Sequence, residues 1–103
     1  MLDIEYYSNI IEAFDSVMVK DLDHVLIRHS YENGTIIYPH THHRDDEWVI
    51  ASKGNFKVSS EGDEKEFNLE GMEVITIYYA AGREHALTVL GDKLDYFVLR
   101  KSV

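Results

Sequence analysis

The spacing of the glycines is the feature that most constrains the fold of this chain. Each of the six adjoins a polar residue, and they recur at intervals of 8 to 20 residues. The runs between them are rich in Val, Ile, Tyr, Phe and Thr, which favour strands. Short strands separated by turns in this way are typical of an all-β sandwich or barrel. We therefore expect turns at the six glycines: Gly34, Gly54, Gly62, Gly71, Gly82 and Gly91.

The apolar and β-branched runs predict the strands, and the N-terminal segment differs from all of them. Tyr7, Ile10, Ile11 and Phe14 recur there at spacings of three, one and three. Because that periodicity matches one face of a helix, we expect a helical segment at about Ile4–Phe14. The strand candidates are Ser16–Val19, His24–Tyr31, Ile36–His42, Trp48–Ser52, Phe56–Ser60, Glu66–Leu69, Val74–Tyr79, His85–Val89 and Leu94–Arg100.

Length and charge limit what the chain can be. Its 103 residues leave room for one domain, which we divide into a helical segment at residues 1–15 and a barrel at residues 16–103. Since there are no cysteines, a disulfide framework, a thiolate metal site and a cysteine nucleophile are excluded. The net charge of −9 makes nucleic acid and anionic membranes poor partners. A cation or a small molecule is the better expectation.

No segment predicts secretion or membrane insertion. Asp3 and Glu5 stand where a secretory signal carries basic residues. The longest apolar-rich run, Val74–Ala81, is far shorter than the roughly 20 residues of a membrane-spanning helix. We therefore expect a cytoplasmic protein without a membrane partner.

Three histidines and one glutamate form the pattern that carries chemistry. His40 and His42 are two residues apart on an expected strand, so their side chains share a face. Glu47 opens the next strand after a charged turn, and a hairpin would bring its carboxylate back toward them. His85 begins another strand after the turn at Gly82. Nitrogen and oxygen ligands of this kind favour Mn, Fe, Co, Ni, Cu or Zn over Ca or Mg.

This pattern resembles the first sequence motif of the cupin superfamily. The motif consists of a glycine, five residues, His-x-His, four residues, a glutamate, six residues and a glycine. This chain meets it in full, at Gly34, His40, His42, Glu47 and Gly54.

The second cupin motif is met in part. Gly71, Gly82 and His85 match it. Ala80 stands where the family has proline, Val89 replaces an asparagine, and eight residues rather than five precede Ala80 after the first glycine. These departures affect the loop before Gly82 and leave the spacing to the third histidine intact.

The resemblance, which spans about Gly34 to Arg100, implies the fold, the metal and the assembly. The fold would be an all-β cupin barrel, a double-stranded β-helix or jelly roll. Small cupins commonly pair as homodimers, and the apolar segment from Tyr6 to Phe14 could lie in such a contact. Cupins with this ligand set include dioxygenases, sugar-phosphate isomerases, decarboxylases and oxalate-degrading enzymes. One divalent transition metal, such as Fe, Mn, Ni or Zn, would bind His40, His42, Glu47 and His85.

The residues around these ligands predict an apolar pocket with the metal at one end. By strand parity Tyr38 faces the same way as His40 and His42, so it is a possible pocket residue. His24 and His29 lie on opposite faces of one expected strand and are surface or core histidines; His29 shares its face with apolar residues, so it is the one of the two that favours burial, with a place near the pocket as the lesser alternative. A phosphorylated substrate would need an inward Lys or Arg. Only Arg28 and Arg83 are near, which disfavours such substrates.

Three functions stay open at this point. The first is an enzyme acting on a small organic molecule at the metal, where open coordination positions would accept substrate, water or dioxygen. The second is a sensor or binding protein that takes up a small molecule or metal without turnover. The third is a metal that only stabilises the barrel, and it ranks last because structural sites usually close a tetrahedral shell. A cupin that keeps these ligands without a metal is the alternative to all three.

Overall fold

The computed structural model describes residues 2–17 and 24–102. These residues form seven strands and one helix, and all of the strand pairings are antiparallel. Burial alternates along the strands, as in β6, because successive side chains point to opposite faces of a sheet. The elements are β1 (Asp3–Tyr7), α1 (Ile10–Val17), β2 (His24–Glu32), β3 (Ile36–His40), β4 (Asp45–Ser60), β5 (Asp63–Tyr79), β6 (His85–Val89) and β7 (Lys93–Ser102).

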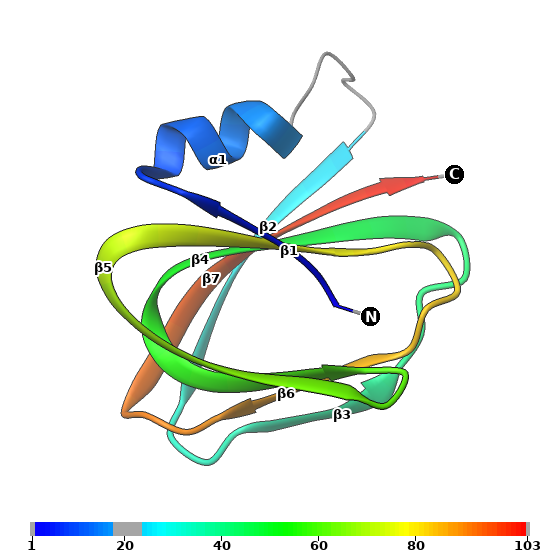
Figure 1. The fold of residues 1–103 in the computed structure, drawn as a ribbon. Helices are drawn as coiled ribbons and strands as arrows, with labels where there is room; N and C mark the ends of the chain where they lie inside the picture. Colours follow the sequence, from blue (N-terminus) through cyan, green and yellow to red (C-terminus); the bar gives the residue numbers. More distant parts are fainter. Residues whose placement is uncertain (1, 18–23, 103) are drawn as a thin grey trace.

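Two long strands give the barrel its shape. β4 and β5 pair with each other along most of their length, and both curve round the side of the barrel (Figure 1). The first half of β4 pairs with β7 and the second half with β6. Each long strand therefore belongs to two layers. One layer also contains β1, β2 and β7, and the other contains β3 and β6.

The turns expected at Gly54 and Gly71 are not turns. Both glycines lie inside a strand, so four of the expected strands merge into β4 and β5. The φ of Gly54 is +137°, and a Cβ there would lie 2.7 Å from Cδ1 of Leu94. The register of β4 shifts just before this glycine, between Ala51 and Lys53. The glycines thus let the strands bend from one layer to the other without ending.

The predicted helix at Ile4–Phe14 is displaced along the chain. Residues Asp3–Tyr7 form β1, which pairs with β5 at the edge of the sheet. The helix begins at Ile10 because Asn9 caps it: its side-chain oxygen accepts a hydrogen bond of 2.9 Å from the backbone N–H of Glu12. The strand expected at Ser16–Val19 is helical at residues 16 and 17, and its remainder lies outside the described residues.

Helix α1 packs on the outer face of the barrel, above β1 in Figure 1. Ala13 is fully buried against Ile50 and Val74, and the ring of Phe14 meets that of Phe97 edge-on with centroids 5.3 Å apart. The apolar N-terminal segment therefore covers a face of its own sheet. Ile11 is 69 % exposed on the other side of the helix. The homodimer stays a prediction.

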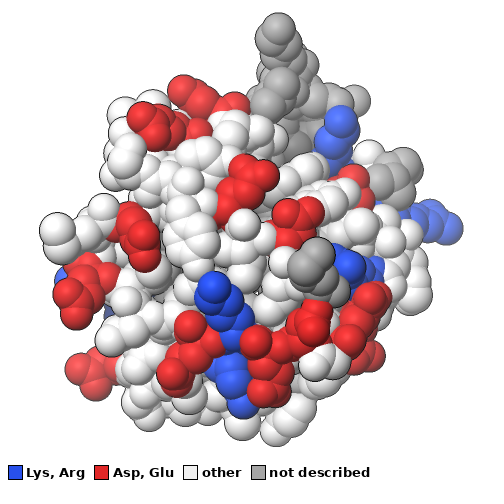
Figure 2. Space-filling model, in the orientation of Figure 1, with Lys and Arg blue, Asp and Glu red and all other residues white. Residues whose placement is uncertain are grey.

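Acidic side chains predominate on the face drawn in Figure 2, where Lys and Arg are fewer and lie among them. This distribution agrees with the net charge of −9. Within residues 2–17 and 24–102, no helix has the length and apolar character needed to cross a membrane.

Candidate metal centre

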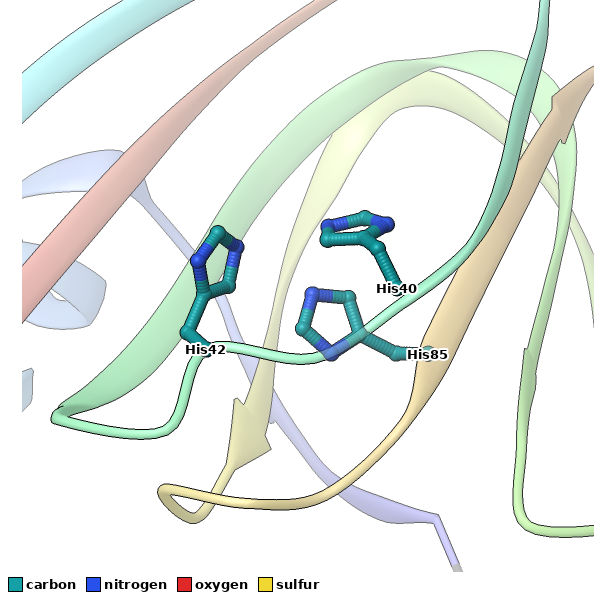
Figure 3. Close-up of side chains that lie close together, drawn as sticks. All are labelled: His40, His42 and His85. Atoms are coloured by element: carbon teal, nitrogen blue, oxygen red, sulfur yellow. The ribbon is translucent and has the colours of Figure 1, made fainter.

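The fold brings three histidines to one end of the barrel interior. His40 ends β3 and pairs in register with His85 at the start of β6, while His42 follows in the loop to β4. The three rings turn toward one another (Figure 3). A ring nitrogen of each lies within 4.8 Å of a ring nitrogen of each of the others. We call these residues the histidine trio.

Backbone carbonyls orient two of the three rings. Nδ1 of His40 lies 2.9 Å from the carbonyl oxygen of Tyr38, and Nδ1 of His85 lies 3.1 Å from that of Arg83. A carbonyl only accepts hydrogen bonds, so Nδ1 must carry the proton in both rings. The lone pair of each neutral ring is then on Nε2, as a metal ligand requires. The ring of Tyr79 stacks on that of His85 with centroids 4.1 Å apart, which further fixes its orientation.

Glu47 stands beside two members of the trio. Its carboxylate is buried, with Oε2 at 3.0 Å from Nε2 of His85 and Oε1 at 3.4 Å from Nε2 of His42. Both Nε2 atoms are buried and have no hydrogen-bond partner among the described residues. When His85 is neutral, its lone pair faces a carboxylate oxygen at 3.0 Å, and a bound cation would remove the repulsion between the two. These donors therefore fit a divalent metal ion.

Arg100 binds the same carboxylate from β7. Its Nε donates a hydrogen bond of 3.0 Å to Oε1 of Glu47, and the two residues are register partners on neighbouring strands. Arg100 was not predicted as a site residue from the sequence. A partial signal was present, because Leu94, Tyr96 and Val98 alternate along the expected strand and Arg100 continues their face, but its partner Glu47 lies on another strand.

Electrostatics keep the carboxylate of Glu47 charged. Burial alone would raise its pKa, but the close approach of the His85 ring, followed by the hydrogen bond and charge of Arg100, outweighs burial and lowers the pKa to about 2. At His42, burial and the positive charge of Arg100 outweigh Glu47 and lower the pKa below its ordinary value. The ring of His42 is therefore neutral at pH 7, which leaves its lone pair available.

Comparisons with known proteins agree with the barrel geometry. No family model and no curated protein matches the sequence. Among solved structures, KdgF from a Halomonas species is 16 % identical with a TM-score of 0.68, and the match covers 97 % of this chain and 81 % of that one. A Cupin 2 conserved barrel domain protein from Salinispora arenicola is 14 % identical, with a TM-score of 0.64 and coverage of 99 % and 76 %. The chain has the cupin fold.

A third neighbour with the cupin fold is described as a predicted oxalate decarboxylase from Thermotoga maritima. It is 14 % identical with a TM-score of 0.68, and the match covers 97 % of this chain and 81 % of that chain. At identities this low, the structural matches show the fold alone, and it is the fold that the sequence motifs indicated. What the site does must be argued from its own residues.

The loop between β5 and β6, which departs from the second cupin motif, is hydrogen-bonded to the loop between β3 and the start of β4, which carries part of the first motif. The backbone N–H of Gly82 donates to the carbonyl oxygen of His42 at 2.9 Å, and that of Ala81 donates to Oδ1 of Asp46 at 2.9 Å. The N–H of Arg83 closes a turn onto the carbonyl of Ala80 at 3.0 Å, with Gly82 at a φ of +86°. These bonds fix the approach to His85 without the family's proline.

A cavity of about 90 Å³ extends from His40, His85 and Glu47 into the cupin barrel. Its far side is formed by His29, Tyr31 and Tyr96, which we call the aromatic wall. Nδ1 of His29 lies 3.1 Å from the hydroxyl of Tyr31, and the ring of Tyr96 lies within 5.8 Å of both other rings. His29 thus lines the pocket, which was the lesser alternative for this residue from the sequence. The remaining lining residues are Ile37, His40, Glu47, Val49, Tyr79, His85, Ala86, Leu87, Val98 and Arg100.

Tyr38 is not a pocket residue, contrary to the prediction from strand parity. Its side chain is 73 % exposed, and it is not among the residues that line the cavity. The register of β3 shifts between Ile37 and His40, so two inward residues are three positions apart. An irregularity of this kind breaks the alternation on which the prediction relied.

The two arginines considered from the sequence also lie outside the cavity. Arg28 is on the surface, where its guanidinium is 3.4 Å from a carboxylate oxygen of Asp95. Arg83 pairs with Glu61 at 3.6 Å. Arg100 is the basic residue that lines the cavity.

Proposed function

We propose that this chain is a small metal-dependent enzyme that acts on a small organic molecule. One divalent transition metal would bind the histidine trio and Glu47. The observation that carries the proposal is the pair of buried Nε2 atoms, on His42 and His85, which face a buried carboxylate and have no hydrogen-bond partner among the described residues. Buried polar atoms are rarely left in this state unless a ligand satisfies them.

The residues of the chain divide the work around that ion. When bound, the ion would supply Lewis-acid polarisation of a substrate oxygen. Glu47 offsets part of the positive charge, and Arg100 holds that carboxylate in place. The apolar walls of the cavity, which include Val49 and Leu87, exclude bulk water and so strengthen each polar interaction inside.

The reaction class that we propose is dioxygenase-, isomerase- or decarboxylase-like. One fold neighbour is described as a predicted oxalate decarboxylase, which supports the third of these. The cavity is small, at about 90 Å³, whereas pockets for drug-sized ligands span roughly 300–1,000 Å³. A substrate with a few carbon atoms is the size that such a cavity accepts.

The competing function is a sensor that binds a metal or a small molecule without turnover. The cavity supports it as well, because binding requires only the contacts and enclosure that a substrate would also use. The two functions differ in one measurable property, the consumption of a ligand.

The test begins with metal-free protein, to which Fe(II), Mn(II), Ni(II) or Zn(II) is added in a calorimetric titration. We expect one ion per chain. The loaded protein is then incubated with small organic acids and carbonyl compounds, while oxygen uptake and proton NMR spectra are followed. Consumption that stops in Glu47→Ala supports the enzyme, and stoichiometric binding without consumption supports the sensor. A wild-type protein that binds none of the four ions would overturn the proposal.

A further inference from the structure

Arg100 indicates the class of molecule that the cavity accepts. We propose that the cavity binds a small monocarboxylate, with the guanidinium of Arg100 as the anchor for the carboxylate group. This inference rests on the proposed function, because it places the ligand beside the metal. It adds the chemical class of the ligand, which the trio alone does not specify.

The hydrogen bonding of Arg100 carries the inference. A guanidinium has five N–H donors, and its two terminal nitrogens carry four of them. Within the described residues, the hydrogen bond of Arg100 is made by Nε, to Glu47. The terminal nitrogens have no partner in the described part of the chain, on a side chain that lines the cavity and is 30 % exposed. A fork of parallel N–H groups matches the two oxygens of a carboxylate.

The charges inside the cavity favour an anion. Glu47 is the one carboxylate among the lining residues, and Arg100 neutralises it. A divalent ion on neutral histidines then leaves the interior with an excess of positive charge. Charge within low-dielectric walls attracts a counter-ion strongly. The protein as a whole carries a net charge of −9, which disfavours the approach of a multiply charged anion. A single carboxylate satisfies both conditions.

The cavity walls define the rest of the ligand. Ile37, Val49, Leu87 and Val98 present aliphatic side chains between the trio and the aromatic wall. Apolar walls favour an apolar chain, and a volume of about 90 Å³ limits its length to a few carbons. A short-chain monocarboxylate is the simplest ligand with these properties.

The experiment compares propanoate with propanamide, which has nearly the same shape but no charge. Each is titrated into wild-type protein, first metal-free and then loaded with Zn(II), at constant ionic strength set with chloride. The side-chain Nε–H signal of Arg100 is followed by two-dimensional NMR. We expect propanoate to shift this signal in both forms, with tighter binding in the zinc form, and propanamide to leave it unchanged. Equal responses to the two probes, or none, would overturn the inference.

A matched pair of variants tests the role of the guanidinium. Arg100→Gln removes it from the cavity, and Arg28→Gln removes an equal charge from the surface, where Arg28 is 66 % exposed. We expect the affinity of the zinc form for propanoate to fall at least about tenfold in the first variant, or about 1.4 kcal/mol, and to stay within about twofold in the second. Unchanged affinity in Arg100→Gln contradicts the inference.

Two further measurements keep the outcomes separate. Zn(II) affinity is measured in each variant first, so loss of the metal, which tests the proposed function, is distinguished from loss of the carboxylate. If Arg100→Gln does not fold, Arg100→Lys takes its place, because lysine keeps the positive charge but lacks the two parallel N–H donors of the guanidinium. Propanoate should then bind at least about threefold more weakly than in wild type, and equal affinity would count against the anchor.

Discussion

The two ends of the cavity both carry imidazole rings, but they differ in how the ring nitrogens are bonded. At the histidine trio, carbonyls take the Nδ1–H groups of His40 and His85, and Nε2 of His85 has no hydrogen bond among the described residues. At the aromatic wall, Nδ1 of His29 faces the hydroxyl of Tyr31 at 3.1 Å, and its ring lies against two tyrosines.

This difference shows that the partners of a histidine, more than its presence in a pocket, determine what it can do. A ring whose Nδ1–H is held by a carbonyl presents a fixed lone pair to whatever lies on its other side. A ring bonded to a hydroxyl has a partner that both donates and accepts, so nothing about it demands a cation. The trio therefore has the donors that the proposed metal ion would need, and the aromatic wall does not.

The largest expected effect separates the two ends by their metal affinity. We expect His85→Ala to lower the affinity for Zn(II) by roughly a thousandfold, more than the 10–100-fold that follows from loss of an outer partner of a ligand. His29→Ala removes an equal ring from the other end and should change the affinity by less than about threefold. Competition with a chromophoric chelator measures both.

The contrast would fail if His29→Ala weakened zinc binding as much as His85→Ala. Circular dichroism of each metal-free variant serves as the control, since an unfolded variant loses the site for a trivial reason. His29 would then belong to the metal centre, and the division of the cavity into two ends would be wrong.

Acid should weaken the end that holds Glu47. The pKa of this carboxyl is lowered from 4.5 to about 2, so the unfolded state binds the proton more tightly than the folded state. Its contribution to stability is fully present above pH 4.5 and is lost as the pH falls through 2. The full contribution of Glu47 to the free energy of unfolding is about 3 kcal/mol. Urea titrations of metal-free protein from pH 6 to pH 2 should show this loss, and Glu47→Gln should flatten that part of the profile.

The glycine spacing and the apolar, β-branched runs of the sequence predicted most of the strands but not the bends of the barrel. β6 has the expected bounds, and β2, β3 and β7 differ from theirs by a few residues. Gly54 and Gly71 were read as turns because a glycine with positive φ serves turns and in-strand bends alike. Whether such a glycine makes a turn or a bend depends on whether the chain beyond it pairs with the same neighbouring strand. Both segments around Gly54 pair with β5, a long-range fact that no local pattern contains.

The candidate site was more predictable than its surroundings. The motif spacing identified His40, His42, Glu47 and His85, which lie close together. His42 follows the end of β3, so it does not share a strand face with His40 as expected. Tyr38 was misplaced because strand parity does not survive the irregularity next to it. Arg100 was missed because its importance comes from a register partner on another strand.

Loosening the loop beside the histidine trio should lower the free energy of unfolding moderately. Asp46 accepts a hydrogen bond from the backbone N–H of Ala81, which joins the loop after β5 to the start of β4. Asp46→Ala removes a charge-assisted bond, with an expected loss of about 1–2 kcal/mol of unfolding free energy. Zn(II) affinity should fall as well, because the same loop leads to His85. Asp46→Asn keeps an acceptor oxygen and should recover most of both quantities. A variant that loses stability but keeps its zinc affinity would separate the loop from the site.

Alkali should weaken the opposite end of the cavity. Burial, followed by the neighbouring Tyr31, raises the pKa of Tyr96 above its ordinary value of 10, so the folded state holds the phenolic proton more tightly than the unfolded state. The contribution of Tyr96 to stability is therefore fully present below pH 10 and is lost as the pH rises above it.

At pH 11 this loss amounts to about 1 kcal/mol from Tyr96 alone. Tyr96→Phe should reduce the decline between pH 10 and pH 11 and leave the acid side of the profile unchanged. Glu47→Gln should do the reverse. Urea titrations across the full pH range then assign each side of the profile to one end of the cavity. If either variant altered both sides equally, the two ends would be coupled through the residues between them rather than titrating independently.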